Sequence, residues 1–184
     1  MKIRTRQIVI AGILGAIALL LGTTPLGFIP VPTPAGHATI MHIPAIIGAI
    51  IEGPVVGAAI GLIFGIHSLL RGGSVMFADP IVAILPRILI GIVAYYAYLP
   101  FKRNLFLASA AAAVAGTLTN TIGVLGLAYL RGYLPTVEAA GAIAVLHGTP
   151  EVIVAAVLVV LLIKPLKAAL PQSGNYAKNG GIKD

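Results

Sequence analysis

A few polar side chains interrupt the apolar stretches of this sequence, and they are the residues that could do chemistry. A polar or ionised side chain inside a long apolar segment is costly, so it normally faces protein or water and marks a site. His147 and Glu151 are four residues apart, which puts them on one face of a helix. The other members of this group are His37, His42, His67, Arg87 and Asn120. Together they predict a buried polar pocket, with residues 33–70 forming one wall.

Arg87 and Glu151 have opposite charges and are expected at comparable depths in a membrane. Arg87 is seven residues into an apolar segment that starts at residue 80, so it should lie roughly 10 Å below the surface. Two interpretations stay open at this point. The two side chains could form a structural ion pair between helices, or one or both could contact a polar ligand.

The same residues give little support to a metal site or an active site. His37 and His42 are five residues apart across a loop–helix junction, and no two histidines have the spacing that places zinc ligands on one helix face. Cysteine is absent, and so are a Ser-centred nucleophile elbow and a Gly-rich phosphate loop. Glu52 and Glu151 are expected near opposite membrane faces. We therefore predict no metal, no catalytic residue and no cofactor in this chain, which should not be an enzyme.

The composition indicates an integral membrane protein. Of the 184 residues, 59% are hydrophobic and only 9% are charged, and the mean hydropathy is +1.05. A soluble domain has about 25% charged residues. The net charge of +7 is explained by basic residues in short loops and tails, as membrane orientation requires, so we expect no nucleic-acid partner.

Apolar segments predict an all-α membrane protein with six transmembrane helices. They are residues 7–21, 39–51, 54–70, 80–99, 105–130 and 137–170. The second is short for a bilayer, so it should be tilted or irregular at its start. The long loop 1, residues 22–38, contains several prolines. Residues 1–170 should form the membrane domain, and residues 171–184 a mobile cytoplasmic tail.

Glycine spacing, a helix cap and a proline predict further details of these helices. Gly57, Gly61 and Gly65 are spaced four apart and predict close packing against a neighbouring helix. Asp79 and Pro80 suit the start of the fourth helix. Pro150 is expected to bend the last helix.

Loop charge predicts the orientation. Six crossings place both ends of the chain on one side of the membrane. Basic residues gather in the N-terminal arm, in the turn at residues 102–103 and in the tail, whereas the opposite side has only Arg71 and Arg131. Both termini should therefore be cytoplasmic and loop 1 extracellular. The polar set then lies in the outer half of the bundle.

Several motifs together resemble a known family, the S components of energy-coupling factor (ECF) transporters. These are small membrane subunits that capture vitamins for ABC-type importers. The similar segments are residues 38–57, 61–65, 77–80, 85–87, 119–121 and 147–151, within a match that runs from about residue 7 to 166. Their combination is similar to the subgroup that includes pantothenate and hydroxymethylpyrimidine carriers.

The resemblance implies a set of functional residues. In this family the ligand lies in the outer half of the bundle, under loop 1 and the loop between the third and fourth helices. The implied substrate-binding residues are His37, Thr39, Phe77, Asp79, Arg87, Asn120, His147 and Glu151. The family docks its first helix on a membrane T component through small residues, and the matching positions are Ala11, Gly15 and Ala16.

The resemblance also implies a mechanism and partners. The chain would bind a water-soluble vitamin or precursor of the pantothenate, hydroxymethylpyrimidine, pyridoxine or lipoate class. It would reside in a prokaryotic plasma membrane and release the ligand inward by toppling, powered by ATP that two partner ATPase subunits use. The alternative is a self-sufficient secondary transporter of a small polar metabolite.

Overall fold

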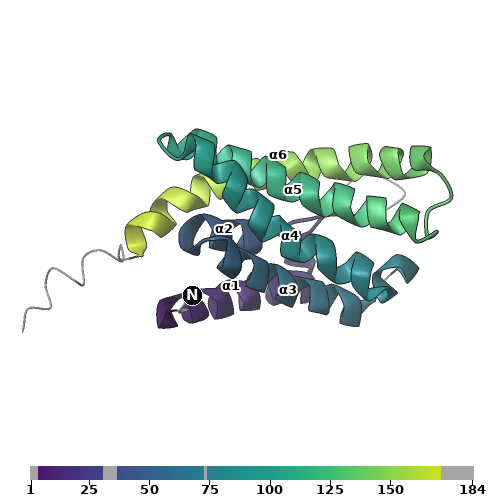
Figure 1. Ribbon diagram of the computed structural model, residues 1–184, viewed down its shortest axis with the longest axis horizontal. Helices are drawn as coiled ribbons and strands as arrows, with labels where there is room; N and C mark the ends of the chain where they lie inside the picture. The colour runs from purple at the N-terminus through teal and green to yellow at the C-terminus, as the bar shows by residue number, and fades with distance from the viewer. Residues whose placement is uncertain (1–3, 31–36, 73, 171–184) are drawn as a thin grey trace, which may run out of the picture.

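The computed structural model describes residues 4–30, 37–72 and 74–170, and these form a bundle of helices (Figure 1). The helices are α1 (Thr5–Thr23), α2 (Ile43–Glu52), α3 (Pro54–Arg71), α4 (Pro80–Tyr98), α5 (Leu105–Leu130) and α6 (Val137–Ala169). Short 3-10 turns are η1 (Pro25–Gly27), η2 (Val75–Ala78) and η3 (Leu99–Phe101), and the strands are β1 (Phe28–Pro30) and β2 (His37–Thr39). The all-helical membrane fold expected from the sequence is confirmed.

Five helices are long and apolar enough to cross a membrane, namely α1, α3, α4 with its η3 extension, α5 and α6. The remaining helix, α2, has ten residues and is too short to cross alone. The predicted start of this helix at residue 39 is wrong, because Thr39 ends β2 and the helix begins at Ile43. The irregular start expected for the segment is confirmed.

The short helix α2 forms the centre of the bundle. Its residues 43–50 are all buried. Ile46 packs in one hydrophobic cluster with Ile60 of α3, Ile90 of α4 and Ala112 of α5. A helix that is apolar on all sides and surrounded by others is the arrangement expected of an interior element. The apolar core therefore fills the part of the bundle that α2 occupies.

The two ends of the bundle differ in which connections they hold (Figure 1). The N-terminus, the α2–α3 turn, the α4–α5 turn and the end of α6 lie at one end, which we call the N-terminal end. The α3–α4 and α5–α6 connections lie at the other, which we call the cavity end. The helix α6 continues through Pro150 without interruption.

Glycines bring α3 and α4 into very close contact, as the four-residue spacing predicted. A Cβ atom on Gly57 would lie 2.8 Å from the Cα of Gly91, and one on Gly65 would lie 2.9 Å from the Cα of Ile84. A Cβ on Gly61 would collide with the carbonyl oxygen of Arg87. Larger residues would push the helices apart, so these glycines fix the position of α4 and of Arg87 on it.

We expect Gly61→Ala to destabilise the protein, because its Cβ would meet backbone that cannot move alone. Overpacking of this kind costs about 1–3 kcal/mol. Thermal unfolding of the detergent-purified protein would measure the loss. The matched control is Gly126→Ala on α5, where the added Cβ meets nothing within 4 Å. An equal effect of both substitutions would contradict the close-packing interpretation.

Candidate ligand-binding cavity

A cavity of about 530 Å³ lies among α3, α4, α5, α6 and the segment that contains β1 and β2. Ligand pockets typically measure about 300–1,000 Å³. Six of the eight side chains expected to bind a ligand line it, and they are Thr39, Phe77, Arg87, Asn120, His147 and Glu151. The structure thus brings together residues that are up to 112 positions apart in the sequence. Whether they contact a ligand stays a prediction.

Arg87 is almost fully buried, with 3% of its surface exposed. Its Nη1 donates a hydrogen bond of 2.7 Å to the carbonyl oxygen of Val82. Its Cζ lies 5.0 Å from the ring centre of Phe77 and 5.4 Å from that of Phe64. Aromatic faces attract a cation at such distances. Its buried Nε, however, has no hydrogen-bond partner among the described residues.

Glu151 is held by protein donors on both of its carboxylate oxygens. The backbone N–H and the hydroxyl of Thr39 donate to Oε1 over 2.8 and 3.1 Å. The hydroxyl of Thr121 donates to Oε2 over 3.3 Å. Glu151 therefore joins β2, α5 and α6 at the wall of the cavity.

The ion pair between Arg87 and Glu151, one of the two interpretations of the sequence, is not formed. Within residues 4–30, 37–72 and 74–170, the salt bridges are those of Arg6 with Glu52 and of Arg131 with Asp79. The opposite charges on α4 and α6 both reach the cavity, but each is engaged by other groups.

The rest of the lining is amphipathic. Asn120 is buried, and its Oδ1 acceptor has no partner among the described residues. Apolar side chains form the remaining surface, including Phe64, Met76, Val124, Leu125 and Ile143. Such a cavity suits a small molecule that has both polar and hydrocarbon parts. In the part of the chain that the structure describes, no three His, Asp or Glu side chains gather closely enough to hold a metal ion.

The comparisons with known proteins agree with this architecture. The model of the family described as "ECF transporter, substrate-specific component" matches residues 6–163. The chain belongs to this family. It is also similar to the "Pantothenic acid transporter PanT" of Lactococcus lactis subsp. cremoris (strain MG1363), with 33% identity over 160 residues that cover 71% of this chain and 78% of the relative. The resemblance to S components is confirmed, and the protein is a multi-pass plasma-membrane protein with a transport role.

Several residues of this S component reach the cavity although they were absent from the expected binding set. Phe28 of β1 and Arg71 at the end of α3 both line it, and the Arg71 Cζ lies 4.4 Å from the Phe28 ring centre. Ser68 of α3 also lines it, and so does His67, which the sequence predicts in the polar pocket but not among the substrate-binding residues. The four-residue spacing of His67 and Arg71 was a usable signal, because it places both on one helix face. No sequence signal singled out Phe28.

Two expected binding residues have other placements. His37 lies in β2, but its side chain is outside the described part of the structure. Asp79 does not belong to the cavity lining. It accepts a hydrogen bond from the backbone N–H of Ile81, as a helix cap does, and pairs with the Nε of Arg131 at 2.6 Å. Asp79 thereby ties the start of α4 to the end of α5.

His42 is fully buried beside α5, outside the cavity lining. Its Nε2 lies 2.9 Å from the hydroxyl oxygen of Thr117. This contact fixes the junction between β2 and α2, since His42 immediately precedes the first helical residue of α2.

The expected docking residues are divided between two faces of α1. Gly15 is buried, and a Cβ on it would lie 2.6 Å from Ile63 of α3. Ala11 is half-buried, and Ala16 is exposed. Gly12, four residues before Ala16, is exposed as well. The outward small-residue pair is thus Gly12 and Ala16, four residues apart on one face of α1.

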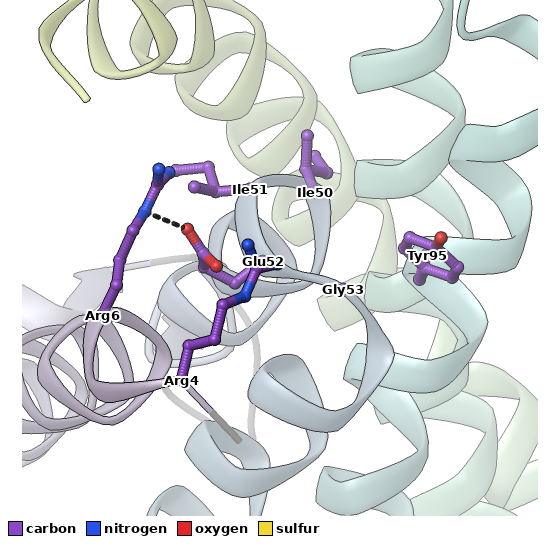
Figure 2. Close-up of a pocket in the computed structure, with 7 residues that line it drawn as sticks. All are labelled: Arg4, Arg6, Ile50, Ile51, Glu52, Gly53 and Tyr95. Carbon is purple, nitrogen blue, oxygen red and sulfur yellow. Dashed lines mark ion pairs between the residues drawn. The ribbon is translucent and has the colours of Figure 1, made fainter. Parts of the chain in front are cut away.

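A second, smaller hollow lies at the N-terminal end, on the cytoplasmic side that loop charge predicts. Figure 2 shows its lining, with Arg4 and Arg6 extending from the start of α1 toward Glu52 of α2 and with Tyr95 on α4. The Nε of Arg6 lies 2.7 Å from the Oε1 of Glu52, and Gln7 donates to the Glu52 carbonyl over 3.2 Å. These contacts tie α1 to the end of α2.

We expect Asp79→Asn to lower the thermal unfolding midpoint at neutral pH, because the amide loses the charged bond to Arg131. That bond holds the pKa of Asp79 below its ordinary value of 3.8. The stabilising contribution is therefore present above pH 3.8 and is lost as the pH falls through the lowered pKa. Unfolding curves of both proteins at decreasing pH should converge in that acidic range. A difference that stays constant over the whole range would refute this role.

Proposed function

We propose that this S component captures pantothenate, or a closely related small carboxylic acid, from outside the cell and delivers it inward as part of an ECF importer. The observation that carries the proposal is a buried guanidinium, that of Arg87, which pairs with no carboxylate of the described residues and lines an amphipathic cavity. The name of the Lactococcus relative, a pantothenic acid transporter, supports the choice of ligand.

The chemistry of pantothenate fits the groups that the cavity offers. Its carboxylate would pair with the Arg87 guanidinium, for which a charge-assisted hydrogen bond is the strongest available contact. The Asn120 Oδ1 would accept a hydrogen bond from a hydroxyl or the amide N–H of the ligand. The branched hydrocarbon would lie against the apolar lining. Arg87 and Asn120 are the two lining residues whose buried polar atoms lack partners in the described structure.

The charge balance favours an anionic ligand over the neutral and cationic vitamins. The described cavity lining holds two arginines, Arg71 and Arg87, and one acid, Glu151. Glu151 already accepts three hydrogen bonds from protein groups. A cationic ligand would have to displace these donors and would also meet the repulsion of Arg87. Hydroxymethylpyrimidine and pyridoxine are therefore the ligands to test after pantothenate. Lipoate also carries a carboxylate, so the preference for pantothenate over lipoate rests on the Lactococcus relative.

We propose that six segments cross the membrane, with β2 and α2 together making the second crossing. Three extended residues and ten helical residues span about 25 Å, which is close to the thickness of the hydrocarbon core. Among the described residues, basic side chains are more numerous at the N-terminal end than at the cavity end. The cavity end has Arg71 and Arg131, and the N-terminal end has Arg4, Arg6, Lys102, Arg103, Lys164 and Lys167. Both termini would then be cytoplasmic, and the cavity would open outward.

The energy would come from partners. The T component would dock on α1, where Ala16 and Gly12 offer an exposed small-residue face and Gly15 lets α1 pack closely on α3. Two ATPase subunits would use ATP, and the loaded S component would topple to release its ligand inward. The chain itself would hold no cofactor and perform no catalytic step.

Arg87→Ala should weaken pantothenate binding by about 10- to 100-fold, the value of a hydrogen bond to a charged group. Isothermal titration of the purified protein would measure this change. Pantothenol, in which a hydroxymethyl group replaces the carboxylate, should bind both proteins with similar affinity. The matched control is Arg103→Gln, which removes an exposed arginine in the α4–α5 turn, away from the cavity lining. Unchanged affinity in Arg87→Ala would exclude Arg87 from the site.

Uptake of pantothenate into vesicles should require the complete importer. Vesicles that contain this chain alone should bind the vitamin but not accumulate it. Vesicles that also contain the T component and both ATPases should accumulate it when ATP is supplied on the side that the ATPases face. Radiolabelled pantothenate measures accumulation. Accumulation by the chain alone under an ion gradient would instead support the alternative, a self-sufficient secondary transporter.

A further inference from the structure

Pro86 lies inside α4, immediately before Arg87. Proline has no backbone N–H, so the carbonyl four residues earlier receives no hydrogen bond from this position. That carbonyl belongs to Val82. The side chains of Val82 and Pro86 are both fully buried. A buried carbonyl that water cannot reach needs a partner from the protein.

The Arg87 side chain supplies that partner. Its Nη1 donates to the Val82 carbonyl over 2.7 Å, back along the helix toward the start of α4. The bond fixes the guanidinium beside Phe77 and Phe64. The Arg87 guanidinium thus pairs with a backbone acceptor that receives no hydrogen bond from residue 86, because that residue is proline.

We propose that Pro86 is a positioning residue for ligand binding. By withholding a backbone N–H, it leaves the Val82 carbonyl open to the Arg87 guanidinium and so fixes the charged group that receives the ligand's carboxylate. The binding role rests on the function proposed above for Arg87. The arrangement of Pro86, Val82 and Arg87 is present without ligand and can be tested without it.

A purely structural role for Pro86 predicts different experimental results. The proline also packs against α5, because a Cβ on Gly123 would lie 3.0 Å from the Pro86 Cβ. If packing or helix shape were its whole contribution, replacing it would change the binding of charged and uncharged ligands alike. If it positions Arg87, the preference for a carboxylate should fall selectively.

The first experiment is a double-mutant cycle on thermal unfolding without ligand. Arg87→Met should destabilise the protein, because it leaves the Val82 carbonyl unpaired. In the Pro86→Ala background the new backbone N–H can pair with that carbonyl, so the same Arg87→Met substitution should lower the unfolding midpoint less. Equal shifts in both backgrounds would overturn the proposed coupling.

The second experiment measures the ratio of the pantothenol and pantothenate dissociation constants. Pro86→Ala should reduce this carboxylate preference by about tenfold, as expected when a charged hydrogen bond is misplaced. The matched control is Pro165→Ala, which removes another proline inside a helix, on α6 and outside the cavity lining. An unchanged ratio in Pro86→Ala, or an equal fall in the control, would overturn the positioning role.

The two experiments separate the inference from the function on which it rests. If the wild-type protein binds neither pantothenate nor pantothenol, the proposed function fails, and with it the role of Pro86 in ligand binding. The unfolding cycle would still decide whether Pro86 controls the partner of Arg87. If binding is found and the cycle shows no coupling, the function stands and the positioning role of Pro86 is refuted.

Discussion

The burial of the Arg87 guanidinium in an apolar bundle is the constraint on which the rest of the structure depends. A charge at this depth is expensive unless protein groups surround it. Here the stabilising groups are one carbonyl of its own helix and two aromatic rings. Phe64 can reach Arg87 because glycines let α3 and α4 touch. Phe77 can reach it because η2 packs against α4, and Phe77 lies in one apolar cluster with Val82. The close packing of α3 on α4 and the aromatic lining of the cavity therefore both lower the free-energy cost of burying Arg87.

Arg87 and Glu151 are bound by different protein groups and not by each other, and this leaves a positive charge at the cavity. A direct pair between Arg87 and Glu151 would have neutralised the site. Instead, Glu151 is saturated by Thr39 and Thr121, and Arg87 keeps its charge for the cavity. The same bonds hold β2 against α6, while Arg71 stacks on Phe28 of the neighbouring strand. A two-stranded hairpin is marginally stable on its own, so these contacts hold one cavity wall in place.

Much of this arrangement could be predicted from the sequence because it follows from local patterns. The helix at residues 105–130 and the turn at Gly53 are set by apolar runs, caps and breakers within a few positions. The gathering of Arg87, Asn120, His147 and Glu151 followed from their depths in neighbouring helices. The start of α2 and the pairing of β1 with β2 were missed, because the strand ladder joins distant residues such as Phe28 and Thr39. Asp79 was assigned to the ligand by family resemblance, yet Arg131, 52 residues away, engages it in the structure.

The contrast between the two ends of the bundle bears on how a ligand could leave. At the cavity end, polar groups line an open volume. Toward the N-terminal end, the buried residues of α2 pack against all five other helices. The contacts of Arg6 with Glu52 and of Lys167 with Tyr98 join helices near this end. An alternating-access path through this core would require separating close-packed apolar surfaces, which costs free energy. Reorientation of the whole domain avoids that cost, and this physical argument supports toppling over gating within the bundle.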